Sequence, residues 1–427
     1  MEIAVRKSQG WFSVHRWLGI LLGAWFALVG ITGSILVYED PIDAWLNPEL
    51  LTSPERGERI SPERLLAKIV AEPTLGRVER MRPPLADGDV YRLTFRTSPN
   101  RRVNVERIEA MFAPVSGRLL GTRPTETLGV SRPLLMKTIY EFHRTVLLGT
   151  AGSNIVGIAG FLLMASAITG MVVAWPRGAG GLAKLLRINW RANITRVLFD
   201  THRAVGAVFV LLLLLATVTG STLVYLNYVR DIVNVFSPVK SFPVVPFHTG
   251  PKSESAEFSR IIDTVRSTYP QQTIVEVHMP FRQTAGYLFY MKQPGDEHRL
   301  GDTIAWVDPV TTQILVERSD RTRSGGETLM HWFYPLHSGT AFGSGGMVAM
   351  CLTGLTPILL VFTGLWVWLR KRPGEKLAEQ RRAARAQPAQ RPSSAARPAS
   401  PRRPAPGSAA APAAPAASAG PPRRALN

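Results

Sequence analysis

The chain has a single cysteine, Cys351, among 427 residues. One thiol cannot form an intramolecular disulfide or a cysteine-rich metal site, and the C-x-x-C-H motif that attaches haem covalently is missing. A G-x-G-x-x-G loop after a strand is missing as well, so the sequence encodes no recognisable nicotinamide or flavin domain.

Charge is lacking over four long stretches, each at least as long as the ~20 residues that cross a bilayer core. These uncharged runs cover residues 17–38, 152–175, 204–228 and 345–369. We predict a transmembrane helix in each. The first run ends at Tyr38-Glu39 and not at a small-residue cleavage site, so we interpret it as a retained anchor and not as a signal peptide.

Basic residues outnumber acidic ones by 50 to 31, for a formal net charge of +19. The excess lies beside the predicted spans, in 1–16, in 176–203 and from residue 370 onward. Because Lys and Arg concentrate in short cytoplasmic loops, we expect these three segments in the cytoplasm and the two long segments between spans outside it. Such a distribution explains the high isoelectric point without a nucleic-acid-binding groove.

The long outward segments are each predicted to be a small α+β module. Helical patterns cover 61–71 and 255–269, and strand patterns cover 90–96, 103–112, 273–279, 285–292 and 303–307. A turn followed by a strand closes each module, at 113–120 and 308–315. Glycine-rich stretches at 149–153 and 339–346 predict breaks at the start of the second and fourth spans.

The predicted organisation follows from these patterns. It comprises a cytoplasmic N-terminus (1–16), a first span (17–38), a first outward module (39–142), an outer histidine segment with the second span (143–175), a cytoplasmic loop (176–203), a third span (204–228), a second outward module (229–336), an outer histidine segment with the fourth span (337–369) and a disordered cytoplasmic tail rich in Pro, Ala and Arg (370–427).

The two halves of the sequence repeat the same motifs. His15-Arg16, Thr32-Gly33-Ser34 and Leu36-Val37-Tyr38 recur 187 residues later as His202-Arg203, Thr219-Gly220-Ser221 and Leu223-Val224-Tyr225. His143 and His337 each precede a Thr-Gly pair, Thr169-Gly170 and Thr363-Gly364, by 26 residues. Each half contributes two spans, so the repeats run parallel. The fold class predicted is a membrane α+β protein, a four-helix bundle from two parallel repeats with two outward α+β modules.

Four histidines therefore lie at the ends of four spans in two matched pairs. The predicted topology places His15 with His202 on the cytoplasmic side and His143 with His337 on the outer side. Neutral imidazoles facing each other across a bundle can bind haem iron from both sides. We predict two non-covalent b haems, one per pair. The alternative is a bare duplication that keeps the histidines for packing or for a capping hydrogen bond. Close helix packing is the expected role of the Thr-Gly pairs.

Other residues are weaker candidates for haem binding. Arg16, Arg144 and Arg203 each follow a paired histidine and could hold haem propionates, or could reach lipid phosphates. His331 is an alternative outer ligand. His248, His278 and His298 are interpreted as ordinary surface residues of the second module.

The order and spacing of these motifs resemble the PepSY-associated transmembrane family. The resemblance rests on His15-Arg16-Trp17-Leu18-Gly19, Phe142-His143-Arg144, His202-Arg203, Leu336-His337-Ser338-Gly339 and the Asp308-Pro309-x-Thr311 turn, and it covers about residues 10–372. It implies four spans, periplasmic PepSY modules, and haem-mediated reduction of Fe(III)–siderophore at a bacterial inner membrane, as in ferrisiderophore reductases. Ala113 replaces Asp308 in the first module, so the turns themselves are not expected to be ligands.

The sequence thus favours a di-haem electron-transfer enzyme that takes electrons from quinol or from a separate cytoplasmic reductase. A non-enzymatic membrane protein whose PepSY modules bind peptide or restrain a peptidase is the alternative. A transporter is disfavoured, because the predicted spans lack buried acids or bases for coupling and the repeats are not inverted.

Overall fold

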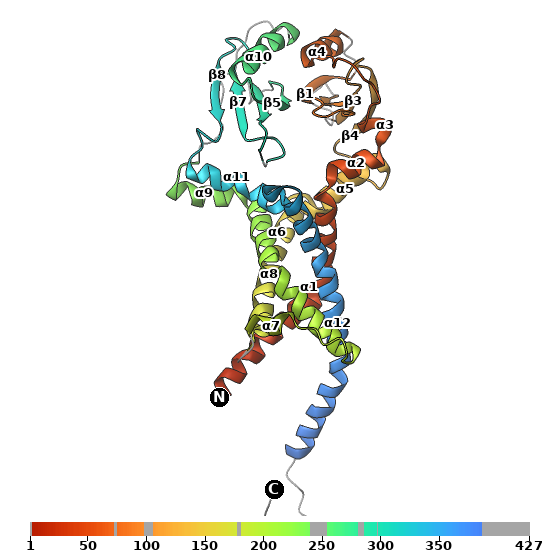
Figure 1. The fold of residues 1–427 in the computed structure, drawn as a ribbon, viewed down its shortest axis with the longest axis vertical. Helices are drawn as coiled ribbons and strands as arrows, with labels where there is room; N and C mark the ends of the chain where they lie inside the picture. The colour runs from red at the N-terminus through yellow and green to blue at the C-terminus, as the bar shows by residue number, and fades with distance from the viewer. Residues whose placement is uncertain are drawn as a thin grey trace, which may run out of the picture. The chain divides into compact units, whose positions relative to one another are not determined.

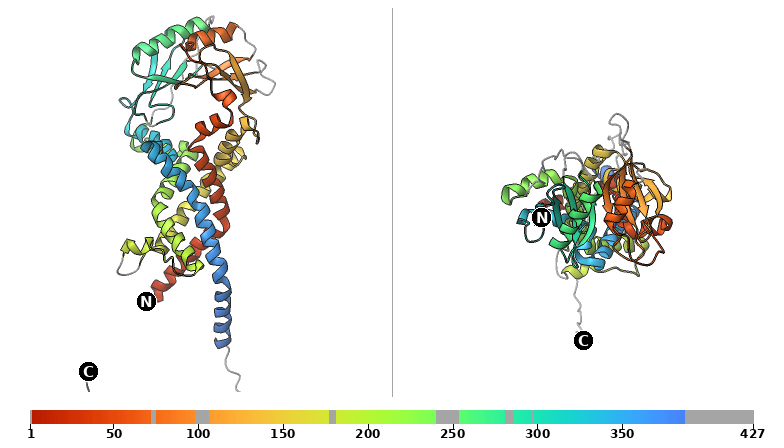
Figure 2. Two further views of the ribbon diagram at one scale, coloured as in Figure 1. Left: turned by 45° about the vertical axis from the view of Figure 1, so that its right-hand side comes forward. Right: turned by 90° about the horizontal axis from the view of Figure 1, so that it is seen from above.

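The computed structural model describes residues 2–71, 75–97, 106–176, 181–239, 254–280, 286–296 and 298–386. Four of its helices are long and apolar enough to cross a membrane, over Gly10–Leu36, Gly149–Ala174, Ile194–Val224 and Thr340–Lys371. They form a bundle beside an antiparallel sheet (Figures 1 and 2). The protein is therefore a membrane α+β protein.

The helices of the first half are α1 (Glu2–Leu36), α2 (Glu39–Leu46), α3 (Pro48–Leu51), α4 (Pro62–Ala71), α5 (Arg132–Thr145), α6 (Gly149–Ala174) and α7 (Gly181–Leu186). Those of the second half are α8 (Ile194–Val224), α9 (Leu226–Phe236), α10 (Glu254–Thr268), α11 (Gly325–Ser338), the 3-10 turn η1 (Thr340–Phe342) and α12 (Gly343–Ala386). The tail predicted from residue 370 begins as part of α12, because its first residues are rich in the helix formers Ala, Arg, Glu and Gln. Its remainder, 387–427, lies outside the described residues.

The strands of both halves form a single sheet. They are β1 (Arg77–Arg82), β2 (Tyr91–Arg96), β3 (Arg107–Phe112), β4 (Leu119–Pro124), β5 (Thr273–His278), β6 (Tyr287–Lys292), β7 (Thr303–Val307) and β8 (Ile314–Arg318). Their order is β4-β3-β2-β1-β5-β6-β7-β8, and neighbouring strands are antiparallel. The two α+β modules are thus joined edge to edge through β1 and β5, and residues 103–105 of one predicted strand lie outside the described residues.

One face of the sheet is covered by α4 and α10 (Figure 1). The buried core between them includes Leu65 and Leu66 of α4 and Phe258, Ile261 and Ile262 of α10, which pack against apolar residues of the strands. The spacing of these residues puts them on one side of each helix, as the sequence pattern predicts. The other face carries two smaller buried clusters, Met111 with Leu51 of α3 in the first half and Leu288 with Trp306 in the second.

Small residues bring the membrane helices together. Gly30 of α1 approaches Gly354 of α12 so closely that a Cβ at residue 30 would lie 2.1 Å from the Gly354 carbonyl oxygen. The Ser34 hydroxyl donates to the Cys351 carbonyl oxygen at 2.7 Å across the same contact. Gly157 of α6 packs on Tyr225, which follows α8, and a Cβ at residue 157 would lie 2.6 Å from Cε2 of that ring. The first half therefore contacts the second at two seams of the bundle.

A sharp break precedes both α6 and α12. Val146 and Leu147 have positive φ angles of 44° and 63° between α5 and α6, and Gly339 has a φ of 83° between α11 and η1. Both breaks include predicted glycines, because Gly149 also has a positive φ of 57°, and the first break begins three residues earlier, at Val146. Both breaks turn a histidine-bearing helix, α5 or α11, out of line with the span that follows.

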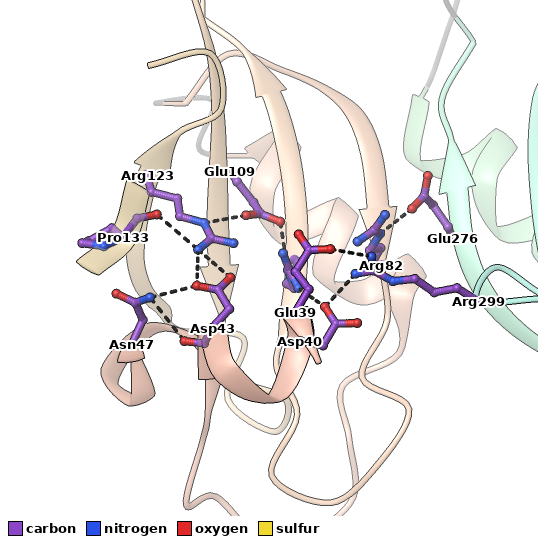
Figure 3. Close-up of polar contacts among 11 residues, drawn as sticks. Glu39, Asp40, Asp43, Asn47, Arg82, Glu109, Arg123, Pro133, Glu276 and Arg299 are labelled. Atoms are coloured by element: carbon purple, nitrogen blue, oxygen red, sulfur yellow. Dashed lines mark hydrogen bonds and ion pairs between the residues drawn. The ribbon is translucent and has the colours of Figure 1, made fainter. Parts of the chain in front are cut away.

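Ion pairs join α2 to both halves of the sheet, as Figure 3 shows. Asp43 of α2 accepts from Arg123 of β4 at 2.9 Å, and Arg123 also donates to Glu109 of β3. From the second half, Arg299 donates to Asp40 at 2.6 Å and to Glu39 at 3.2 Å. Because α2 directly follows α1, these contacts connect the sheet to the bundle.

Candidate histidine sites

The four predicted histidines meet in the two predicted pairs. The ring centroids of His15 on α1 and His202 on α8 lie 6.0 Å apart. Those of His143 on α5 and His337 on α11 lie 6.3 Å apart. We call His143 and His337 the proximal pair, because α5 and α11 lie at the sheet end of the bundle, and His15 and His202 the distal pair (Figure 1). Each pair takes one histidine from each half of the chain.

Each imidazole is held by a backbone carbonyl of the neighbouring span in its own half. The Nδ1 atom of His15 lies 2.9 Å from the Ser166 carbonyl oxygen, and that of His202 lies 3.0 Å from the Leu360 carbonyl oxygen. The proximal histidines are held in the same way. The Nδ1 atoms of His143 and His337 lie 3.0 and 3.1 Å from the carbonyl oxygens of Val29 and Ala216.

This contact fixes the tautomer. A carbonyl oxygen can only accept a hydrogen bond, so Nδ1 carries the proton and Nε2 of the neutral ring carries the lone pair. A histidine that binds a metal through one nitrogen typically donates the other N–H to a carbonyl or carboxylate. All four rings therefore have the protonation pattern of a ligand that binds through Nε2.

Threonines of the Thr-Gly pairs reinforce three of the four contacts. The hydroxyl oxygens of Thr32, Thr219 and Thr363 lie 3.2, 3.1 and 3.0 Å from Nδ1 of His143, His337 and His202. Each hydroxyl also donates to a carbonyl of its own helix, so its lone pair faces the imidazole N–H. At His15, Thr169 instead donates to the Ser166 carbonyl that holds the ring.

The glycines of the same pairs make room for the rings. A Cβ added to Gly170 would lie 2.8 Å from Cε1 of His15, and one added to Gly33 would lie 2.9 Å from Cε1 of His143. The corresponding distances are 2.8 Å from Gly220 to His337 and 3.2 Å from Gly364 to His202. The sequence interpretation assigned these glycines to helix packing. In the structure they pack on imidazoles: α6 and α12 receive His15 and His202 of the spans α1 and α8, whereas α1 and α8 receive the histidines of α5 and α11.

The separation within each pair suits a haem. An iron–imidazole bond is about 2 Å long and the ring centroid lies about 1 Å behind the nitrogen, so two axial imidazoles have centroids about 6 Å apart. The ring planes cross at 77° in the distal pair and 43° in the proximal pair. Rotation about the iron–nitrogen bond permits either angle. Two protein ligands suffice because a porphyrin supplies the other four nitrogens.

The comparison with protein families covers this whole arrangement. The model of the PepSY-associated TM region matches residues 12–371, which include both histidine pairs and all four spans. The chain belongs to the PepSY-associated transmembrane family. None of the curated proteins compared with this PepSY-associated protein matches it.

Of the three predicted propionate partners in this PepSY-associated protein, two have other partners. Arg144 pairs with Glu141 at 3.1 Å and is half-exposed. Arg203 donates to the carbonyl oxygens of Leu185 and Arg187 and so holds the loop that contains α7. Arg16 differs from both, because its Nε is buried without a hydrogen-bond partner. An orphaned buried donor next to His15 fits an anionic group that the distal site would add.

His331 lies away from this chemistry, although it shares α11 with His337. Its Nε2 lies 2.8 Å from Asp302, and its ring centroid lies 5.1 Å from that of His298. His298 is half-buried, with its ring against His331 and Tyr334, and burial and the nearby His331 lower its pKa to about 4. Within the described residues, no group of three or more His, Cys, Asp or Glu side chains is placed to hold a metal ion.

Proposed function

We propose that this chain is a di-haem electron-transfer protein that reduces periplasmic Fe(III)–siderophore at a bacterial inner membrane. The observation that carries the proposal is the pair of matched sites, in which two neutral imidazoles at axial separation each bring an unprotonated Nε2. Bis-histidine ligation leaves no open position on iron, so such sites suit electron transfer and not oxygen binding.

The spacing of the two sites along the bundle supports a route across the membrane. His15 and Gly33, which mark the distal and proximal sites on α1, are 18 residues apart. His202 and Gly220 have the same spacing on α8. Eighteen helical residues rise ~27 Å, which is close to the ~30 Å of a bilayer core. One site would thus serve each face of the membrane.

The charge distribution orients this route. The basic residues of 176–203, including Arg187 and Arg196, lie at the distal end, and short basic loops face the cytoplasm. The distal pair would accept electrons from quinol or from a separate cytoplasmic reductase, and the proximal pair would deliver them on the side of the PepSY sheet. Both termini would then be cytoplasmic and the sheet periplasmic.

The chemistry divides between cofactor and protein. Haem supplies one-electron exchange when bound. The chain's own residues hold the imidazoles in one tautomer through Nδ1, hold them in one orientation against glycine, and exclude other axial ligands. A siderophore grips Fe(III) through hard oxygen donors, and the gain of one electron gives Fe(II), which such donors bind less tightly.

An absorption spectrum of the purified full chain tests the proposal. We expect a Soret band, sharp α-bands on reduction and about two haems per chain. Reduced protein should be reoxidised by a ferric hydroxamate or ferric catecholate complex, with one Fe(II), trapped by a ferrous chelator, for each electron lost. A variant with His15, His143, His202 and His337 all replaced by Leu should be colourless.

Three results would contradict the proposal, the first two in whole and the third in its substrate. Colourless wild-type protein would favour the alternative of a peptide-binding or peptidase-regulating membrane protein. Full haem content in the quadruple variant would show that other residues bind the cofactor. Haem-loaded protein that no ferric complex reoxidises would leave an electron-transfer protein but remove the siderophore as its substrate.

A further inference from the structure

Helix α9 has three distinct sides. It follows α8 after one intervening residue, Tyr225, and runs out sideways from the bundle at the sheet end (Figure 1). At 100° per residue, Leu226, Val229 and Val233 fall on one side. Val233 packs under Gly326 of α11, where a Cβ would lie 3.0 Å from its Cγ1.

A second side of α9 is apolar and exposed. Its members are Tyr228, Ile232, Val235 and Phe236, with exposed fractions from 62% to 85%. They fall within an arc of about 100° on the helix. A contiguous exposed patch of this kind on a short helix marks a surface that something apolar covers.

The third side is polar but nearly neutral. It consists of Asn227, Arg230, Asp231 and Asn234. Arg230 and Asp231 lie 3.8 Å apart, so their charges largely cancel. The Asn234 side chain accepts from the backbone N–H of Val239 at 2.8 Å. This side therefore suits water and offers no cluster of positive charge.

From these three sides we infer that α9 lies in the membrane interface, with Tyr228, Ile232, Val235 and Phe236 inserted among the lipids of the leaflet next to the sheet. The inference is independent of the function proposed above. An amphipathic helix binds a bilayer by burying its apolar side just below the headgroups. Tyrosine is enriched at this depth because one end of the ring is apolar and the other is polar.

The position of α9 in the chain favours lipid over other apolar partners. Span α8 ends at Val224 and α9 begins at Leu226, so the helix starts at the level where the span leaves the bilayer. Span α8 itself carries exposed apolar residues, among them Leu211 and Val218 at 75% and 46% exposure, as a lipid-facing helix does. The apolar side of α9 begins just beyond this span and can therefore enter the same lipid.

The corresponding helix of the first half, α2, forms ion pairs with the sheet. Helix α2 follows α1 as α9 follows α8, at the 187-residue offset of the repeat. Its acidic residues Asp40 and Asp43 bind Arg299 and Arg123 of the sheet. The first half thus uses this position for ion pairs to the sheet, whereas the second half uses it for an exposed apolar side.

Site-directed spin labelling of the full chain in lipid nanodiscs tests the inference. Cys351 is first replaced by Ala, and a label is then attached at Ile232→Cys or at the matched control Asn227→Cys, on the polar side of the same helix. We expect the ratio of oxygen to nickel-chelate accessibility to be roughly tenfold higher at residue 232. Because the polar side carries no net charge, the ratio should be the same in pure phosphatidylcholine and with added phosphatidylglycerol.

Three results would overturn the inference. Equal nickel accessibility at 232 and 227 would place the apolar side in water. A label at 232 that is immobile and shielded from both reagents would indicate a protein contact, and dipolar broadening between labels would identify a second copy of the chain. Protection that appears only with phosphatidylglycerol would make charge, and not apolar burial, the cause.

Discussion

The imidazole of His15 lies directly on Gly170, where a Cβ would approach its Cε1 to 2.8 Å. Gly170→Ala should therefore displace the ring from the distal site. Overpacking of this kind costs about 1–3 kcal/mol, which corresponds to haem binding weakened about tenfold to hundredfold at that site. Haem titration of the apoprotein, followed by the Soret band, measures the effect.

Gly19→Ala is the matched control for this substitution. Gly19 lies in the same bundle, but nothing lies within 4 Å of a Cβ added there. Alanine also has the higher helix propensity, so this variant should bind two haems as tightly as the wild type. If both variants bind alike, the glycine contact does not shape the site.

The two sites should be separable by single substitutions. His202→Leu removes one ligand of the distal pair, whereas His143 and His337 stay 6.3 Å apart at the other end of the bundle. We expect the haem content to fall from about two to about one per chain, with the remaining α-band unchanged. Loss of both haems in a variant that still elutes as a folded monodisperse protein would show that the sites are not independent.

His331 should prove dispensable for haem binding. Its Nε2 is 2.8 Å from Asp302, which pins the ring to the loop after β6. His331→Gln can keep a hydrogen bond to that carboxylate, so we expect two haems per chain and an unchanged reduced spectrum. His337→Gln, on the same helix, should lose the proximal haem. Loss of a haem in the His331 variant would make His331 a ligand and contradict the assignment of His337.

The histidine pairing could be predicted from the sequence because the two halves repeat the same motifs at fixed offsets. Four spans, their order and the matched offsets place His15 beside His202 and His143 beside His337 with no knowledge of side-chain contacts. The buried sides of α4 and α10 could be predicted as well, because Leu65 and Ile261 lie at helical spacing among charged residues. Both predictions rest on local periodicity and on the topology rules for membranes.

What the sequence did not reveal depends on contacts between distant segments. Strand β1 reads Arg-Val-Glu-Arg-Met-Arg, which has no strand-like alternation of its own. It forms because it pairs with β2 of its own half and, at its other edge, with β5, where Arg80 and Arg82 pair with Glu276 of the other half. The contacts of Gly33 and Gly170 with imidazole rings also join distant segments, so the sequence did not predict them. Small-residue motifs in spans usually indicate helix packing.

The junction of the two sheet halves should be sensitive to acid. Burial by itself would raise the pKa of Glu276, but the hydrogen bond from His278 and the charges of Arg82 and Arg80 lower it to about 2. Protonation of the Glu276 carboxylate therefore favours the state in which its ion pairs are broken. The stabilisation is complete above pH ~4.5, the ordinary value for the carboxyl, and is lost as the pH falls toward ~2.

Glu276→Gln should remove this dependence. Leaving the arginines without their buried carboxylate costs about 3 kcal/mol, so amides of β1 and β5 should exchange about a hundredfold faster near neutral pH. Hydrogen exchange of the full chain from pH 2 to 7, corrected for intrinsic rates, gives both the pH dependence and the neutral-pH exchange rate of these amides. Asp87→Asn, which removes the highly exposed partner of Arg59, is the control and should leave these strands unchanged. Identical pH profiles in wild type and Glu276→Gln would exclude the junction as the acid-sensitive element.

Arg299 should couple the second half of the sheet to the start of the first. Its guanidinium donates to Glu39 and Asp40 at the beginning of α2, as Figure 3 shows, and α2 continues the chain from α1. These partners are partly exposed, so we expect Arg299→Gln to weaken the protection of α2 amides by about 1 kcal/mol.

A double-mutant cycle assigns this effect to the ion pair. If Arg299 acts through Asp40, then Asp40→Asn should cost nearly as much alone as it does together with Arg299→Gln, with a coupling energy of about 0.5–1 kcal/mol that shrinks in high salt. Arg59→Gln, which removes the same charge from a pair inside the first half, should not change α2. Strictly additive losses would mean that Arg299 stabilises α2 through its other neighbours, and the sheet would then be connected to the bundle mainly through the Asp43–Arg123 pair.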